Sequence, residues 1–96
     1  MSTTAPSTDV RFDLDVAWGL SPQVALRDEA FGALAYHYGN RRLVFLKSRQ
    51  LVALVRALGS HDTARQAIDD VVPEAQRSSY GRALARLVDS EVICAR

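Results

Sequence analysis

Residues 31–47 limit the folds open to this chain more than any other segment, because they predict a β-hairpin that is apolar on both faces. The central pair Gly39-Asn40 suits a tight two-residue turn, and aromatic, aliphatic and β-branched residues flank it. Folding about this pair sets Tyr36 opposite Leu43 and Leu34 opposite Phe45. A small antiparallel sheet normally has one polar face, so we expect helices to cover one face of residues 43–46. Either a partner covers the other face or the strand is fully buried within the domain.

Composition narrows the class of protein. Ninety-six residues are enough for one domain with a single core. Twelve basic and eleven acidic side chains leave a net charge of +1, which disfavours an obligate nucleic-acid binder and a basic membrane-attachment segment. The chain has a single cysteine, Cys94, no apolar run of about 20 residues and no signal peptide, so we expect a soluble cytoplasmic protein without an internal disulfide.

The order of predicted elements indicates an α+β fold, in which a three-stranded antiparallel meander is followed by three helices. A strand over residues 23–27 precedes the hairpin. Ser48 is placed to cap a helix that stops at Gly59, and Asp62 opens a second, shorter helix. A third helix is predicted over residues 74–89.

Residues 1–17 are expected to form a flexible N-terminal arm ahead of a folded domain of residues 18–96. Alternate positions near the end of the arm are apolar, namely Val10, Phe12, Leu14, Val16 and Trp18. This two-residue period predicts a half-buried strand that competes for apolar surface near the sheet. It leaves three alternatives open: pairing with the edge of the domain's own sheet, pairing with a second copy in a homodimer, or anchoring through Trp18 alone.

No set of residues in the sequence indicates catalysis or metal binding. His37 and His61 have no partners at the spacing of metal ligands, and the carboxylates of Asp69-Asp70 are typical of a solvated surface. Ser78-Ser79 lacks the glycines of a nucleophile elbow. We therefore expect a protein that is not an enzyme and that holds no cofactor.

A winged-helix DNA-binding transcriptional regulator is the main structural alternative, since three short helices beside a hairpin are also its pattern. Arg77, Arg82 and Arg86 on the last helix would then contact phosphates. Acidic residues flank the same helix, however, and would repel a DNA backbone. The hairpin also precedes the helices, whereas a wing usually follows the recognition helix, so we expect no nucleic-acid partner.

One stretch of the chain carries a family resemblance. The run WGLSPQVALRDEAFGALAYHY over residues 18–38, followed by RRL at 41–43 and FLK at 45–47, closely resembles the peptide chaperones of the mycofactocin pathway. Residues 18–93 as a whole resemble the PqqD-like family of precursor-peptide recognition domains, also called RiPP recognition elements. The resemblance implies a winged-helix-like domain of the PqqD type.

The same resemblance implies a function and a site. Such domains bind the N-terminal leader of a ribosomally made precursor peptide as an added antiparallel strand and present it to a radical S-adenosylmethionine maturase, which holds the iron–sulfur clusters. The docking strand then comprises Arg41, Arg42, Leu43, Val44, Phe45, Leu46 and Lys47. The facing wall on the last helix comprises Tyr80, Ala83, Leu84 and Leu87. We expect Val44→Pro to remove a donor from the open edge of the docking strand.

Overall fold

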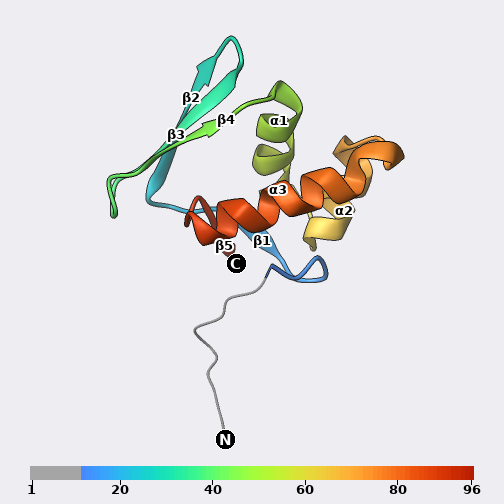
Figure 1. Ribbon diagram of the computed structural model, residues 1–96. Coiled ribbons are helices and arrows are strands. Elements are labelled where there is room, and N and C mark those ends of the chain that lie inside the picture. Colours follow the sequence, from blue (N-terminus) through green and yellow to red (C-terminus); the bar gives the residue numbers. More distant parts are fainter. Residues whose placement is uncertain (1–11) are drawn as a thin grey trace, which may run out of the picture.

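Two small antiparallel sheets and three α-helices make up the protein in the computed structural model, which describes residues 12–96 (Figure 1). The larger sheet has the order β2-β3-β4, formed by β2 (Val24–Glu29), β3 (Gly32–His37) and β4 (Leu43–Leu46). This meander, followed by helices, confirms the α+β fold class. The predictions made for residues 1–11, the Val10 position included, fall outside the described residues.

The helices follow the meander. They are α1 (Arg49–Ala57), α2 (Ala64–Val71) and α3 (Arg77–Asp89), with 3₁₀ turns at Leu58–Ser60 and Glu74–Gln76. Helix α1 lies between the sheet and α2 and contacts both (Figure 1). The smaller sheet pairs β1 (Trp18–Leu20) with β5 (Ile93–Ala95) and brings the two ends of the domain together.

The predicted pairing of the hairpin is confirmed, with Tyr36 opposite Leu43 and Leu34 opposite Phe45. The predicted two-residue turn is wrong. The His37 N–H donates to the Arg42 carbonyl at 3.0 Å and the Arg41 N–H donates to the His37 carbonyl at 2.7 Å, which makes residues 38–41 a four-residue connection. Both kinds of turn are centred on the Gly39–Asn40 bond, so the pairing of the strands is the same.

Contacts inside the turn explain why the longer connection forms. The buried His37 ring accepts hydrogen bonds at Nδ1 from the N–H groups of Gly39 and Asn40, at 3.0 and 3.1 Å. A Cβ on Gly39 would lie 2.5 Å from the Gln23 Oε1 and 2.8 Å from the His37 Cε1, so any other residue there would have to displace these two side chains. The left-handed residue is Arg41, at φ 64°, and not Gly39.

The two faces of the sheet differ in exposure. Ala33, Ala35 and Leu46 face the helices and are at most 1% exposed. On the opposite face, Leu43 is 60% and Phe45 is 56% exposed. The alternative of a strand buried on both faces is therefore wrong, because helices cover only one face of the larger sheet.

Helix boundaries differ from the predictions in detail. Ser48 caps α1 as predicted, its hydroxyl accepting from the Leu51 N–H at 2.9 Å. Helix α1 does not stop at Gly59 but continues into a 3₁₀ turn. The cap of α2 is Thr63 and not Asp62, since the Thr63 hydroxyl accepts from the Gln66 N–H at 3.2 Å.

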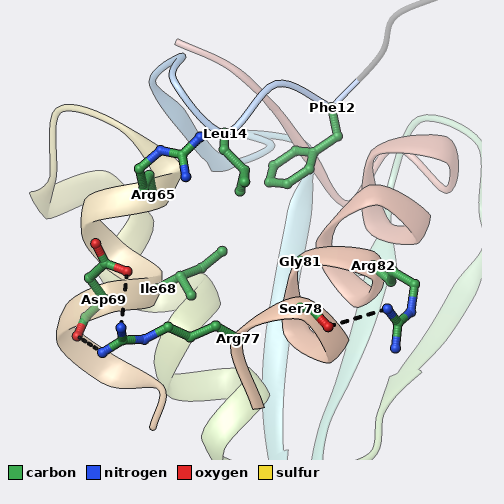
Figure 2. A pocket seen from close by; sticks show the side chains of 9 residues that line it. All are labelled: Phe12, Leu14, Arg65, Ile68, Asp69, Arg77, Ser78, Gly81 and Arg82. Atoms are coloured by element: carbon green, nitrogen blue, oxygen red, sulfur yellow. Dashed lines mark hydrogen bonds and ion pairs between the residues drawn. The ribbon is translucent and has the colours of Figure 1, made fainter. Parts of the chain in front are cut away.

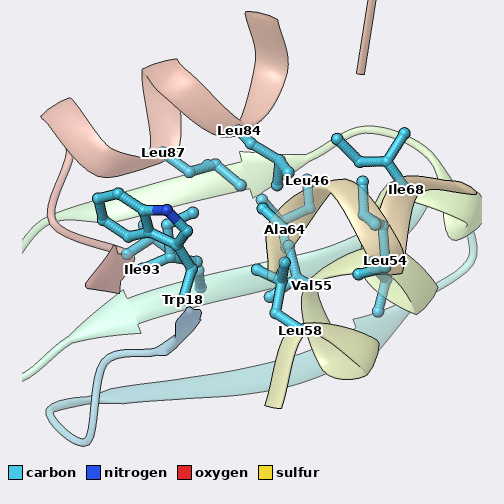
Figure 3. Close-up of a cluster of buried hydrophobic side chains, with 14 of the residues drawn as sticks. Trp18, Leu46, Leu54, Val55, Leu58, Ala64, Ile68, Leu84, Leu87 and Ile93 are labelled. Atoms are coloured by element: carbon cyan, nitrogen blue, oxygen red, sulfur yellow. The ribbon is translucent and has the colours of Figure 1, made fainter. Parts of the chain in front are cut away.

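One hydrophobic core joins the large sheet, the helices and the small sheet (Figure 3). Leu84 of α3 points toward Leu46 of β4, and Leu54 of α1 lies beneath them; all three are fully buried. Trp18 of β1 is 2% exposed and closes the core at the small sheet. The sheet face, α1 and α3 are therefore held at fixed positions relative to one another.

From Phe12 to Ala17, the segment before β1 forms a turn and not the predicted strand. The carbonyls of Leu14 and Val16 accept from the N–H groups of Arg65 and Ala64 at 2.8 and 3.1 Å. These N–H groups belong to the first turn of α2 and would otherwise lack partners. The Asp15 carboxylate also pairs with Arg65 at 2.8 Å. Within the chain, this segment is anchored by the cap on α2 as well as by Trp18.

Candidate functional site

The open edge of β4 is the first part of the candidate site. Strand β4 pairs only with β3 among the described residues. Hydrogen-bonded and non-bonded pairs alternate along an antiparallel ladder. Since His37 bonds to Arg42, Val44 bonds inward to Ala35, while the N–H and C=O groups of Leu43 and Phe45 point to the open edge. The expectation that Val44→Pro removes an edge donor is therefore wrong, because the edge donors are Leu43 and Phe45.

A cleft of about 400 Å³ lies between β4 and α3. Its residues come from three elements: residues 44–47 of β4 and its end, Leu51 of α1, and Ala83, Arg86, Leu87 and Ser90 of α3 and its C-cap. The α3 residues recur at intervals of three and four, so they form one stripe of the helix. The floor is apolar, and the charged groups along the cleft, Lys47 and Arg86, are both basic. An extended chain placed against β4 would have this stripe on its other side.

The structure brings together six of the residues that the sequence assigned to the site. They are Val44, Phe45, Leu46, Lys47, Ala83 and Leu87. Three more lie at the start of the docking strand without lining the cleft: Arg41 in the turn, followed by the exposed Arg42 and Leu43.

The two other wall residues lie elsewhere. Leu84 is fully buried in the core, facing Leu46 (Figure 3). The Tyr80 hydroxyl is 3.2 Å from the Ser48 hydroxyl, so its ring covers the start of α1 beside the cleft. The wall of the cleft is therefore displaced by three residues, about one helical turn, from the predicted stripe, toward Arg86 and Ser90.

Sequence reasoning missed three cleft residues, Leu51, Arg86 and Ser90. Arg86 and Ser90 lie three and seven positions after Ala83, so the helical period places them on the same face as Ala83 and Leu87 and could have indicated them. Arg86 was considered only as a phosphate contact in the DNA-binding alternative. Leu51 is partly buried and also packs against the hydrophobic core.

A second hollow, of about 490 Å³, lies on the other side of α3 (Figure 2). Phe12 and Leu14 border it, together with Ile68 of α2 and Gly81 of α3. It is the larger of the two, but it borders no open strand edge. Its basic groups already have partners within the chain, as Figure 2 shows for Arg77 with Asp69 and for Arg82 with Ser78. We therefore place the candidate site at β4 and not here.

The histidines have structural contacts. His37 organises the hairpin turn, and its Nε2 lies 3.9 Å from the Glu91 carboxylate. His61 contacts the Ala57 carbonyl at 2.8 Å and the Asp70 carboxylate at 3.2 Å. No group of three or more potential metal ligands occurs within residues 12–96.

One charged pair outside the cleft has shifted pKa values. The hydrogen bond and the charge of Arg65 lower the pKa of the exposed Asp15 carboxyl, and the same carboxyl raises the pKa of Arg65. This pair joins the segment before β1 to α2.

No helix in residues 12–96 is both long and apolar enough to cross a membrane.

Comparisons with known proteins agree on one family. Residues 17–94 match the Peptide chaperone MftB family. The peptide chaperone MftB of Mycolicibacterium smegmatis is 44% identical over 92 residues, covering 95% of this chain and 90% of that protein. Proteins of the same name from Mycobacterium ulcerans and Mycobacterium tuberculosis are 43% and 42% identical, covering 85% and 88% of this chain and 76% and 79% of the relatives. No solved structure matches the chain significantly.

Proposed function

The chain belongs to the Peptide chaperone MftB family, and from this premise we propose that it binds the leader of the mycofactocin precursor peptide as an added antiparallel strand on β4. A peptide chaperone is not an enzyme, so the protein's contribution is to hold and present the peptide. The observation that carries the proposal is the open edge of Leu43 and Phe45 beside an apolar cleft. Adding a strand to such an edge is a general mode of peptide recognition.

The two sides of an added strand would meet different surfaces. Side chains alternate along a strand, so every second leader residue would point into the cleft, toward Leu51 and Leu87. The residues between them would lie on the exposed sheet face beside Leu43 and Phe45. Both sets of neighbours are apolar. This arrangement supports a leader segment that is apolar at successive positions and that covers the face left open by the helices.

The expected affinity follows from these contacts. About four strand hydrogen bonds at ~1 kcal/mol each and two apolar anchors at ~3 kcal/mol each give ~10 kcal/mol, and ordering the peptide costs ~2–5 kcal/mol. The remainder corresponds to a Kd of roughly 1 to 200 µM. Binding of this strength allows release, which suits a carrier that passes its peptide to another protein.

We propose that the receiving protein is a radical S-adenosylmethionine maturase, as the family resemblance implies. The iron–sulfur clusters and S-adenosylmethionine then belong to that enzyme and not to this chain. We also propose a cytoplasmic location, because the exposed Cys94 is a free thiol and a reducing compartment preserves it.

A titration with amide detection tests the binding mode. Isotope-labelled protein titrated with a synthetic leader should show its largest amide shifts at residues 43–47 and 83–90. A scrambled peptide of the same composition is the matched control and should give small, dispersed shifts. Largest shifts around Phe12 and α2 would place the leader in the other hollow and exclude strand addition on β4.

A second test addresses the role of carrier. The protein incubated with precursor peptide, S-adenosylmethionine and a reductant should leave the mass of the peptide unchanged. Adding the maturase should change that mass, and removing this protein from the complete mixture should slow the change. A modified peptide in the absence of maturase would contradict a role limited to carrying.

A further inference from the structure

Most basic side chains in residues 12–96 have a partner within the chain. Those paired with a carboxylate are Arg27, Arg56, Arg65 and Arg77. Those bonded to a carbonyl or a hydroxyl are Arg49, Arg82 and Arg96. Basic groups outside the candidate site are therefore engaged intramolecularly.

The remaining basic side chains of this region are Arg41, Arg42, Lys47 and Arg86, and none has a side-chain hydrogen bond or an ion pair with another residue in 12–96. All of them are exposed and all border the candidate site. Arg41 and Arg42 precede β4, Lys47 follows it, and Arg86 lies on the opposite wall. No aspartate or glutamate lines the cleft. The unpartnered positive charge of the described region is concentrated around one strand.

We infer that the segment bound in this cleft is acidic, with carboxylates at both ends of the stretch that pairs with β4. The inference rests on the proposed function and specifies the class of its peptide. Arg42 and Lys47 are five positions apart, which is roughly 17 Å along an extended chain. An antiparallel leader strand would meet both charges if its own carboxylates were about five residues apart, with apolar residues between them. Arg86 would pair with a carboxylate that points across the cleft.

A peptide fits this site better than a nucleic acid. The edge of β4 presents alternating N–H and C=O groups, which match the backbone of an extended peptide. The floor between the charges is aliphatic, from Val44, Leu51 and Leu87. Phosphates could pair with the basic groups, but they would leave the strand edge unsatisfied.

Charge reversal at matched positions tests the inference. The probe is a synthetic leader of the precursor peptide, with affinity measured by calorimetry at low and at physiological salt. Arg86→Glu should weaken binding roughly tenfold, because it replaces an attraction by a repulsion beside the peptide. The control is Arg82→Glu, which makes the same change one turn earlier on the same helix but at the other hollow, and which should change the affinity less than about twofold. Circular dichroism should show both variants folded.

Exchange of charges between the partners provides a second measurement. A leader in which one acidic residue is replaced by lysine should bind Arg86→Glu more tightly than the parent leader does, and should bind the unaltered protein more weakly. Such a reversal requires direct pairing of the two charges. A structural role of Arg86 would not produce it.

Three outcomes would overturn the inference. A leader with its acidic residues changed to amides could bind as tightly as the parent, Arg82→Glu could weaken binding as much as Arg86→Glu, or duplex DNA could displace the leader through the same basic groups. Failure of the proposed function is distinguishable from these outcomes. If the leader does not bind on β4, Phe45→Pro would leave leader binding intact. If only the inference about charge is wrong, Phe45→Pro would still weaken leader binding, and Arg86→Glu would bind the leader as the parent protein does.

Discussion

Helix α3 has a hollow on each side. On the α2 side, called here the completed side, groups of the chain itself pair with the polar groups; on the β4 side, called the open side, polar groups of residues 12–96 are left without partners. On the α2 side, Phe12 and Leu14 pack over the helices, and the basic residues pair with Asp15 and Asp69. On the β4 side, a strand edge is unpaired, and Arg86 and Lys47 lack ion-pair partners among residues 12–96. Volume does not distinguish the two, since the completed side is the larger. The two sides differ in their unpaired backbone and charged groups, and this difference is why we propose that the β4 side binds the peptide.

The largest effect is expected for Leu84→Ala, which tests whether the Leu84 side chain belongs to the core or to the wall of the cleft. Leu84 is fully buried, so its truncation should lower the free energy of unfolding by about 2–5 kcal/mol. Leader affinity at a temperature where the variant is folded should change little. Urea denaturation and calorimetry measure the two quantities. Weakened binding with unchanged stability would return Leu84 to the cleft wall.

Phe45→Pro should have the next largest effect, on the open side only. It removes an N–H that points to the free edge, and proline is tolerated on edge strands, so the fold should survive. Leader affinity should fall roughly tenfold or more, because a strand bond is lost and the added strand is displaced.

The matched control for this variant is Phe45→Ala, which keeps the N–H and should lose only a few-fold in affinity through its smaller apolar contact. Val44→Pro provides the contrast within the strand. It breaks a bond to β3 and should destabilise the hairpin itself. Equal losses for Phe45→Pro and Phe45→Ala would show that the side chain, and not the strand edge, binds the leader.

Phe12→Ala addresses the completed side. The Phe12 ring packs on Trp18 with centroids 5.4 Å apart, so the free energy of unfolding should fall by about 1–2 kcal/mol. Leader affinity should not change, because Phe12 borders the hollow away from β4. Thermal denaturation and calorimetry check both statements. A variant with weaker leader binding would show that the two hollows are coupled through α3.

The smallest effect concerns the pair of Asp15 and Arg65. Because Arg65 lowers the pKa of Asp15 in the folded state, the pair contributes stability above the ordinary carboxyl pKa and loses it as the pH falls through the lowered value. Both groups are exposed, so the contribution is small. Asp15→Asn should reduce stability slightly at neutral pH and make no difference once the pH lies below the lowered pKa, where the carboxyl of the parent is protonated. An equal deficit at every pH would assign the change to packing.

Local patterns were sufficient for several parts of this protein. Two apolar segments on either side of a turn centred on Gly39–Asn40 predicted the register of the hairpin, because the register depends only on that centre. Ser48 was predicted as a cap because its hydroxyl serves an N–H three residues away. The assignment of residues 41–47 as the docking strand came from the family resemblance and stays a prediction.

The tertiary structure decided what these patterns leave open. The alternation of apolar and polar residues before Trp18 predicted a strand. Instead, the carbonyls of Leu14 and Val16 accept hydrogen bonds from N–H groups in the first turn of α2, which would otherwise lack partners. Leu84 and Leu87 are indistinguishable in the sequence, yet one is fully in the core and the other borders the cleft. Which N–H groups of β4 face outward depended on one hydrogen bond between His37 and Arg42. The sequence alone determined which side chains are apolar and how they repeat, whereas burial and backbone pairing depend on contacts that form only in the folded chain.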